Sequence, residues 1–323
     1  MSFGSRNNVF VKAGRIYQQI APVFSFIDYI FWLRKRKHSA SDPSAIFIIG
    51  PPRSGTTLTY QLLTAGFENI HLTNIWNLLY STPVLGGMIS ERLCANHIAS
   101  FKSRHGYVSG LCGEAEGLKF WKYWTGQGLT EDQTQLNPKR MKKLVKVLTD
   151  YIPSPGKIYI AGYIGHVFCM NFIRHYFPRA LFIHVRRDLI SNAYSIYRDF
   201  PNKYFSIRPK GIDVDTDCRY AQIAKQIIEV HFRVFEQWDE DVIPVHYEEV
   251  CRNPEKVIER INDFAEEQGI LLKRKHNMPQ NFHLNRTDAG YNEHSRALDI
   301  ALANELRKLS FEDTKPFFEM ISQ

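Results

Sequence analysis

The chain has 323 residues, 44% of them hydrophobic and 23% charged, which is the composition of an ordinary globular protein and excludes disordered and fibrous classes. The length suits one large α/β domain with embellishments. A net charge of +8 favours anionic partners such as nucleotides, sulfated or phosphorylated molecules and acidic membranes.

The cysteine pattern gives no sign of a metal site or a disulfide framework. No C-x-x-C pair and no regular spacing occurs among the five residues, which are Cys94, Cys112, Cys169, Cys218 and Cys251. We therefore expect no bound metal and a reducing, cytoplasmic environment.

Residues 1–44 form an aromatic and basic segment that we separate from the domain at 45–323. Its apolar run, IAPVFSFIDYIFWL at residues 20–33, is too short to span a bilayer and contains Asp28. The basic run RKRK follows at residues 34–37. Two interpretations stay open: a helix packed on the domain, or a peripheral membrane contact through residues 20–37, with the cations on anionic headgroups.

From residue 45 onward, predicted strands alternate with predicted helices. The strands are AIFIIG at 45–50, KIYIAG at 157–162, ALFIHV at 180–185 and DVIPVHY at 241–247. Helical patterns lie at 56–63, 169–177, 191–200, 218–238 and 254–270, and Asn253 and Pro254 look like the N-cap and first residue of the last one. This alternation predicts an α/β fold with a central parallel sheet flanked by helices on both faces.

Residues 72–155 are less regular and rich in aromatics and glycines. We interpret them as a helical insertion that forms the acceptor pocket. The alternative is a helical subdomain that serves only packing.

The loop GPPRSGTT at residues 50–57 joins the first strand to the first helix. It matches the phosphate-binding pattern G-x-x-x-x-G-K-[ST] except that Thr56 replaces the lysine. Backbone N–H groups and the helix end can still bind an anion, and Arg53 places a cation in the loop. Without the lysine, a compact anhydride suits this loop better than a magnesium triphosphate.

An acid that binds magnesium would be expected directly after an apolar strand. The strand at 180–185 instead runs into Arg186 and Arg187 before Asp188. The arginines favour a second anion, and we expect Asp188 to cap the helix that follows.

PPRSGTT after a strand, with FIHVRRDLISNAYSIY further along, resembles the PAPS-dependent sulfotransferase superfamily, where PAPS is 3′-phosphoadenosine 5′-phosphosulfate. The resemblance covers roughly residues 45 to 270 and is nearer the bacterial and membrane-associated branches than the cytosolic animal type. It implies that the 5′-phosphosulfate is bound by Arg53, Ser54, Gly55, Thr56 and Thr57. It also implies that Arg187 and Ser195, eight residues apart, hold the 3′-phosphate.

The resemblance implies transfer of a sulfuryl group from PAPS to a hydroxyl or amine, leaving PAP, with Arg53 serving the leaving phosphate. The general base stays open between Glu116, Glu114 and His166, with His71 a further candidate. The sequence departs from its relatives where Gly162 replaces a lysine and where Asn74 lies near the position of a catalytic Glu. We expect a small-molecule, lipid or carbohydrate acceptor, and the aromatic insertion suggests a hydrophobic one.

Two other functions are weighed beside this one. A P-loop small-molecule kinase or NTPase would also use Arg53 and Arg187, and a non-catalytic PAPS-fold binding protein would tolerate Gly162. Nucleic-acid binding is not expected, because basic residues are not interleaved with aromatics in a known reader pattern. Arg274, Lys275 and Arg286 could reach a nucleotide, but we interpret them as a solvated basic face.

Overall fold

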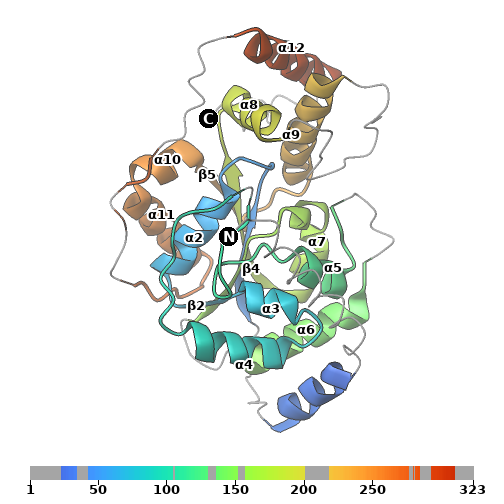
Figure 1. The fold of residues 1–323 in the computed structure, drawn as a ribbon, viewed down its shortest axis with the longest axis vertical. Helices are drawn as coiled ribbons and strands as arrows, with labels where there is room; N and C mark the ends of the chain where they lie inside the picture. Colours follow the sequence, from blue (N-terminus) through green and yellow to red (C-terminus); the bar gives the residue numbers. More distant parts are fainter. Residues whose placement is uncertain are drawn as a thin grey trace, which may run out of the picture.

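A computed structural model describes residues 23–34, 43–104, 106–129, 136–151, 157–200, 218–275, 279, 281–283 and 292–309. Its centre is a five-stranded sheet in the order β2-β3-β1-β4-β5, with every neighbouring pair parallel (Figure 1). The strands are β1 (Ser44–Ile49), β2 (Asn69–His71), β3 (Ile158–Ala161), β4 (Arg179–Arg186) and β5 (Val242–His246). The predicted parallel sheet is confirmed, and only the three-residue edge strand β2 was not predicted.

Helices cover both faces of this sheet. Those after the predicted strands are α2 (Thr56–Gly66), α7 (Met170–Tyr176), α8 (Leu189–Asp199), α9 (Arg219–Glu236), α10 (Tyr247–Arg252) and α11 (Pro254–Glu267), and α12 (Glu293–Lys308) follows. The Asn253 side chain accepts the N–H of Lys256 at 3.2 Å with Pro254 in the first turn, which confirms the predicted cap.

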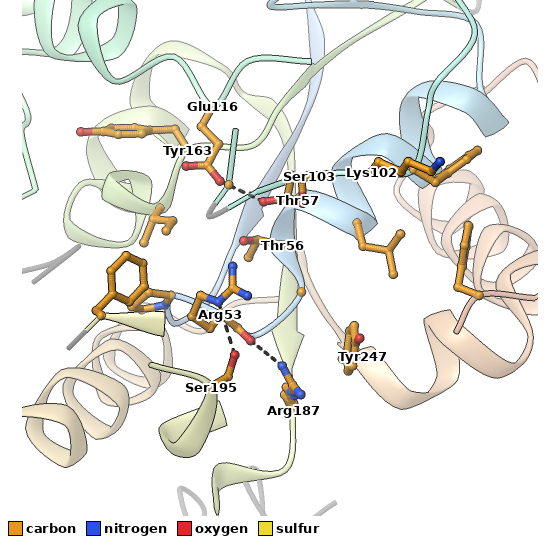
Figure 2. Close-up of a pocket in the computed structure, with 18 of the residues that line it drawn as sticks. Arg53, Thr56, Thr57, Lys102, Ser103, Glu116, Tyr163, Arg187, Ser195 and Tyr247 are labelled. Carbon is orange, nitrogen blue, oxygen red and sulfur yellow. Dashed lines mark hydrogen bonds between the residues drawn. The ribbon is translucent and has the colours of Figure 1, made fainter. Parts of the chain in front are cut away.

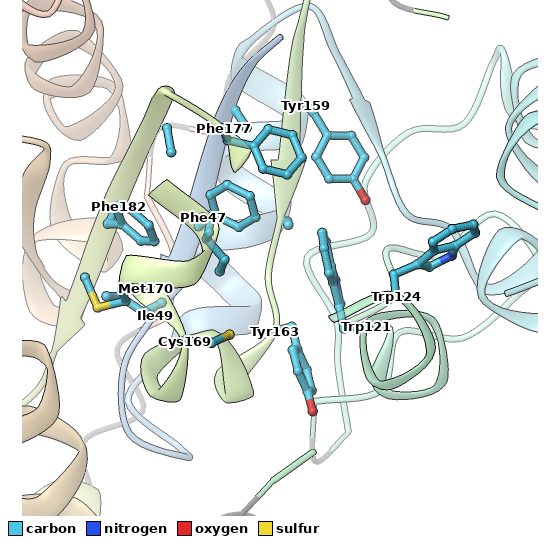
Figure 3. Packing of buried hydrophobic residues seen from close by; sticks show 14 of the residues in the cluster. Phe47, Ile49, Trp121, Trp124, Tyr159, Tyr163, Cys169, Met170, Phe177 and Phe182 are labelled. Atoms are coloured by element: carbon cyan, nitrogen blue, oxygen red, sulfur yellow. The ribbon is translucent and has the colours of Figure 1, made fainter. Parts of the chain in front are cut away.

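The side chains of β1 alternate between two cores, as the period of a strand requires. Phe47 and Ile49 face one core together with Phe182 and Trp121 (Figure 3). Ile46 and Ile48 face the other core, under α2 and α11. Burial of β1 on both faces explains its uninterrupted apolar sequence.

The insertion supplies α3 (Asn74–Leu78), α4 (Pro83–Cys94), α5 (Leu118–Thr125) and α6 (Pro138–Tyr151). The large aromatics of α5, Phe120, Trp121 and Trp124, are buried in the same core as Phe47. These rings therefore pack the domain, whereas other residues of the insertion, among them Glu116, Leu118 and Leu129, line a cavity. The buried rings do not support the argument from composition for a hydrophobic acceptor.

The expected N-terminal helix spans residues 23–34 and contacts α4 and α6. Among the residues that the structure describes, no helix combines the length and apolarity needed to cross a membrane.

A disulfide joins Cys94 at the end of α4 to Cys112, 18 residues later. The expectation that the sequence contains no disulfide was therefore wrong for this pair, whose approach depends on the fold rather than on a spacing motif. Disulfides persist in oxidising compartments, so the cysteines no longer favour a reducing one. Cys169 and Cys251 are buried thiols, and Cys218 is an exposed one.

Removing the disulfide should destabilise the domain. The double change Cys94→Ser/Cys112→Ser should lower the free energy of unfolding by about 3 kcal/mol, because the cross-link restricts the unfolded chain. Urea unfolding measures this effect. Cys218→Ser is the matched control and should change little. A double variant as stable as that control would contradict the expectation.

Candidate functional site

The loop after β1 needs glycine at two positions. Gly50 and Gly55 have φ angles of 153° and 105°. A Cβ on Gly50 would lie 2.6 Å from the carbonyl oxygen of Val185, and one on Gly55 would lie 2.4 Å from Tyr247 Cδ2. The two glycines thus let the loop approach the ends of β4 and β5 closely.

Arg53 occupies a left-handed conformation that non-glycine residues rarely adopt, with φ at 66°. Groups from neighbouring segments hold both its backbone and its side chain in this conformation. Arg187 Nη1 donates to the carbonyl oxygen of Arg53 at 3.0 Å, and Arg53 Nε donates to Ser195 Oγ at 3.3 Å. The Arg53 guanidinium also pairs with Asp199 at 2.7 Å.

One face of α8 makes most of these contacts. Asn192 Nδ2 donates to the carbonyl oxygen of Pro52 at 2.8 Å, and Ser195 and Asp199 contact Arg53. Spacings of three and four residues place these side chains on one side of a helix. The helix begins at Asp188, whose side chain accepts the N–H of Ser191 at 2.7 Å, which confirms the predicted cap.

A cavity of about 860 Å³ opens beside this loop (Figure 2). Residues that follow the carboxyl ends of β1, β3, β4 and β5 line it, and ligands bind at this edge in open α/β sheets. The predicted donor residues that line it are Arg53, Gly55, Thr56, Thr57, Arg187 and Ser195. Ser54 lies behind them, and its buried Oγ has no hydrogen-bond partner in the part of the chain that is described.

The cavity is strongly cationic. Among the described residues that line it, the cations are Arg53, Lys102, Arg187 and Arg198, and Glu116 is the only carboxylate. The first turn of α2 adds N–H groups, because Gly55 provides no side-chain cap. Burial lowers the pKa of Arg187, but an arginine stays charged at neutral pH. The cavity is therefore suited to a ligand that carries several negative charges.

Glu116 is the predicted base candidate that faces this cavity (Figure 2). Its Oε1 accepts a hydrogen bond from Thr57 Oγ1 at 3.0 Å. Burial raises the pKa of Glu116 to about 7, although the bond from Thr57 and the charge of Arg53 act in the opposite direction. A carboxyl group with such a pKa can take up a proton near neutral pH.

The other candidates do not line the cavity. Glu114 is buried, accepts Gln61 Nε2 at 3.1 Å and lies 3.7 Å from His97 Nε2. His166 is enclosed by Phe47, Trp121 and Tyr163, and burial lowers its pKa to about 3.

His71 is also held away from the cavity, since its Nδ1 lies 2.7 Å from Asn69 Oδ1. Asn74 has a structural role, because its amide donates to the carbonyl oxygens of Val108 and Gly110, both at 2.7 Å.

Tyr60 explains the glycine at position 162. A Cβ there would lie 2.8 Å from the ring of Tyr60, whose hydroxyl donates to the carbonyl oxygen of Leu72 at 3.3 Å. A lysine in place of Gly162 would have to displace this buried ring. The following residue, Tyr163, lines the cavity instead.

Sequence reasoning missed several residues that line the cavity, among them Arg198, Tyr247 and Lys102. Arg198 lies three residues after Ser195 on α8, and Tyr247 directly follows β5. Their positions in the sequence could therefore have placed both at the cavity. Lys102 lies in an irregular segment, where nothing in the sequence indicates that it reaches the cavity.

The basic residues Arg274 and Lys275 make contacts away from the cavity. Arg274 pairs with Glu255, and Lys275 Nζ donates to the carbonyl oxygen of Thr64 at 3.0 Å, so neither lines the cavity. Arg286 lies outside the described residues. Within the described ranges, no group of three or more His, Cys, Asp or Glu residues could hold a metal ion.

The family model described as sulfotransferase family matches residues 43–268. The sulfotransferase STF9 from Mycobacterium avium is 14% identical with a TM-score of 0.45, over 84% of this chain and 70% of that one. STF1 from Mycobacterium tuberculosis is 13% identical with a TM-score of 0.45, over 93% and 80%. None of the curated proteins compared with the chain matches it. The two structures are too distant to indicate a substrate.

The raised pKa of Glu116 should appear in the pH dependence of stability. Since the pKa in the folded protein is about 7, against an ordinary 4.5, folding takes up a proton between these values. The wild-type protein should lose stability as the pH rises through this window. Glu116→Gln cannot titrate, so its stability relative to wild type should rise from about pH 4.5 to 7 and then level off.

Urea unfolding at about pH 4, 6 and 8 measures this difference. The exposed Glu267→Gln is the matched control and should show no such trend. A constant difference between Glu116→Gln and wild type across the three pH values would contradict the shift.

Proposed function

Because the chain belongs to the sulfotransferase family, we propose that it transfers a sulfuryl group from PAPS to a hydroxyl, or an amine, of an acceptor with an apolar body. One observation carries this proposal. The cationic loop of Arg53, the pair Arg187 and Ser195, and the carboxyl group of Glu116 all line one cavity.

The residues present fit a donor with phosphate groups at two ends. Arg53, Thr56, Thr57 and the uncapped first turn of α2 would hold the 5′-phosphosulfate. Arg187 and Ser195 would hold the 3′-phosphate. The buried, unpartnered Oγ of Ser54 is a further donor behind the loop. Asp199 pairs with both Arg53 and Arg198, so it fixes the two guanidinium groups that a bound anion would share.

The reaction requires a base and a site for a leaving phosphate. PAPS supplies the sulfuryl group when bound, and its transfer to the acceptor oxygen leaves PAP. Glu116 would accept the proton of the acceptor hydroxyl, with Thr57 orienting the carboxyl group through Oε1. Arg53 and the N–H groups of α2 would stabilise the charge on the leaving phosphate.

An apolar acceptor is supported by the walls of the cavity rather than by the aromatic insertion as a whole. The apolar and aromatic side chains that line it include Leu118, Leu129, Tyr163, Ile164 and Phe200. Leu118 follows Glu116 by two residues, and Tyr163 appears near Glu116 (Figure 2). An aryl or lipid-like alcohol could pack against these side chains while its hydroxyl reaches Glu116. Measuring the rate of sulfuryl transfer to phenol, lipid and carbohydrate acceptors compares these classes.

The donor site can be tested without an acceptor. PAP should bind the purified protein in the absence of metal, and Arg187→Ala should weaken binding about 100-fold, because a charge-assisted bond to a phosphate is lost. Isothermal titration calorimetry measures both. Arg252→Ala on the exposed end of α10 is the matched control and should bind like wild type.

ATP with magnesium, titrated in parallel, tests the rival kinase function. Binding of magnesium ATP alone would contradict the donor assignment. Tight PAP binding without transfer to any acceptor would instead support a non-catalytic binding protein.

The role of Glu116 can be tested separately. Glu116→Gln should reduce kcat about 100- to 10,000-fold while PAP binding stays near that of wild type, because only proton transfer is lost. The wild-type rate should rise with pH through about 7, where Glu116 becomes ionised. The residual rate of Glu116→Gln should not rise with pH in this range.

Glu114→Gln is the matched control, because Glu114 is buried against Gln61 outside the cavity. Its kcat and its pH profile should follow wild type. If Glu116→Gln keeps its rate and its pH dependence, another group is the base.

A further inference from the structure

The N-terminal helix, residues 23–34, is attached to the domain by polar side chains. Ser25 Oγ donates to Ser81 Oγ at 3.4 Å, and Asp28 Oδ1 accepts the N–H of Leu85 at 2.7 Å. Trp32 Nε1 donates to Asp150 Oδ2 at 2.8 Å. Positions 25, 28 and 32 share one face of a helix, so the helix turns this polar face towards α4 and α6.

Four of its apolar side chains point outward, whereas the remaining large apolar side chains of the helix are half-buried. Val23, Phe26, Tyr29 and Leu33 have between 41% and 66% of their surface exposed. A helix at the surface of a globular protein normally buries its apolar stripe. Because this helix carries apolar side chains on both sides, it leaves a row of large ones in contact with water, which marks an interaction surface.

Exposed lysines border this row. The helix α6 passes beside the N-terminal helix (Figure 1), and Lys146 Nζ lies 5.2 Å from the centre of the Trp32 ring. Lys139, Lys142 and Lys143 precede it on the exposed side of α6, while Leu144 and Leu148 face the core. Lys143 also acts on Asp28, since its charge lowers the pKa of that carboxyl group, which burial raises to about 6.

Within the described residues of the N-terminal helix and α6, the exposed charges are all positive. The carboxylate of α6, Asp150, is buried and bonded to Trp32, and Asp28 is buried as well. Arg34 ends the N-terminal helix as an exposed cation and opens the basic run at 34–37. A second copy that docked through the same face would bring these lysines together, which like-charge repulsion opposes.

An anionic lipid surface satisfies both features at once. Apolar side chains of an interfacial helix enter the boundary between headgroups and acyl chains, and neighbouring lysines bind the headgroups. We propose that the docking face formed by Val23, Phe26, Tyr29 and Leu33 together with Lys139, Lys142, Lys143 and Lys146 binds membranes rich in anionic lipids. The sequence suggested residues 20–37 alone, whereas the fold adds the lysines of α6.

Vesicle flotation with the full chain tests the docking face. The protein should bind phosphatidylcholine vesicles that contain about 30% phosphatidylserine and bind neutral vesicles weakly. Lys139→Glu/Lys142→Glu should weaken partitioning at least about 25-fold, because each lysine near such a surface contributes about a fivefold factor. Phe26→Ser/Leu33→Ser should weaken it as well, and about 0.5 M salt should suppress the electrostatic part.

Matched controls lie elsewhere on the surface. Arg252→Glu/Lys256→Glu reverses two exposed charges on α10 and α11, and Leu271→Ser removes an exposed apolar side chain. Both should bind vesicles like wild type, and thermal unfolding shows whether every variant is folded.

Three results would overturn the proposal. The first is no binding of the full chain to anionic vesicles. The second is equal loss of binding in the controls. The third is dimerisation that Phe26→Ser/Leu33→Ser abolishes, seen by light scattering, without vesicle binding, which would assign the face to a second copy of the chain.

Discussion

The loop after β1 keeps its shape because Arg187, directly after β4, and Asn192 of α8 hold its backbone. Asn192 and Arg187 donate to the carbonyl oxygens of Pro52 and Arg53, and this offsets a left-handed conformation at Arg53 that costs about 1–3 kcal/mol. These contacts are possible because β1 and β4 pair in parallel from Ser44 and Arg179 to Ile49 and His184, so the two strands end side by side. The direction of the Arg53 guanidinium therefore depends on the register of two strands more than 130 residues apart in the chain.

The sequence signals that succeeded are local ones. An apolar, β-branched run such as residues 45–49 predicts a buried strand wherever it lies, and Asn253 followed by Pro254 predicts a helix start from neighbouring atoms alone. The short strand β2 has too few residues for any period to emerge. The disulfide between Cys94 and Cys112 depends on where α4 ends in space. Lys102 enters the cavity for a similar reason, from an irregular segment whose path no pattern encodes.

The two glutamates proposed as the general base also show that local sequence is not enough and that the fold decides. Glu114 and Glu116 are two residues apart and chemically equal in the sequence, and both were candidates. The fold separates them, because Gln61 and His97 contact Glu114 while Thr57 bonds to Glu116 at the cavity. Aromatic composition was misleading in the insertion for a related reason: an aromatic side chain that lines a ligand site and one that fills a core look the same in a sequence. Only the burial of Trp121 and Trp124 in the core shows that they belong to the second kind.

Among the described residues, basic side chains gather on two chemically different surfaces, the cavity and the proposed docking face. In the cavity, Arg53 and Arg187 are oriented by bonds to backbone and carboxylate groups, so their charge is directed at one confined volume. Such fixed guanidinium groups select a compact anion by geometry and are weakly screened by salt. The lysines of α6 are exposed and have flexible side chains. Salt therefore screens their charges strongly, and the positions of their ammonium groups are not fixed. They suit an extended, fluid array of charges, and in the proposed membrane contact the apolar row on residues 23–34 would add an attachment that electrostatics alone could not make specific.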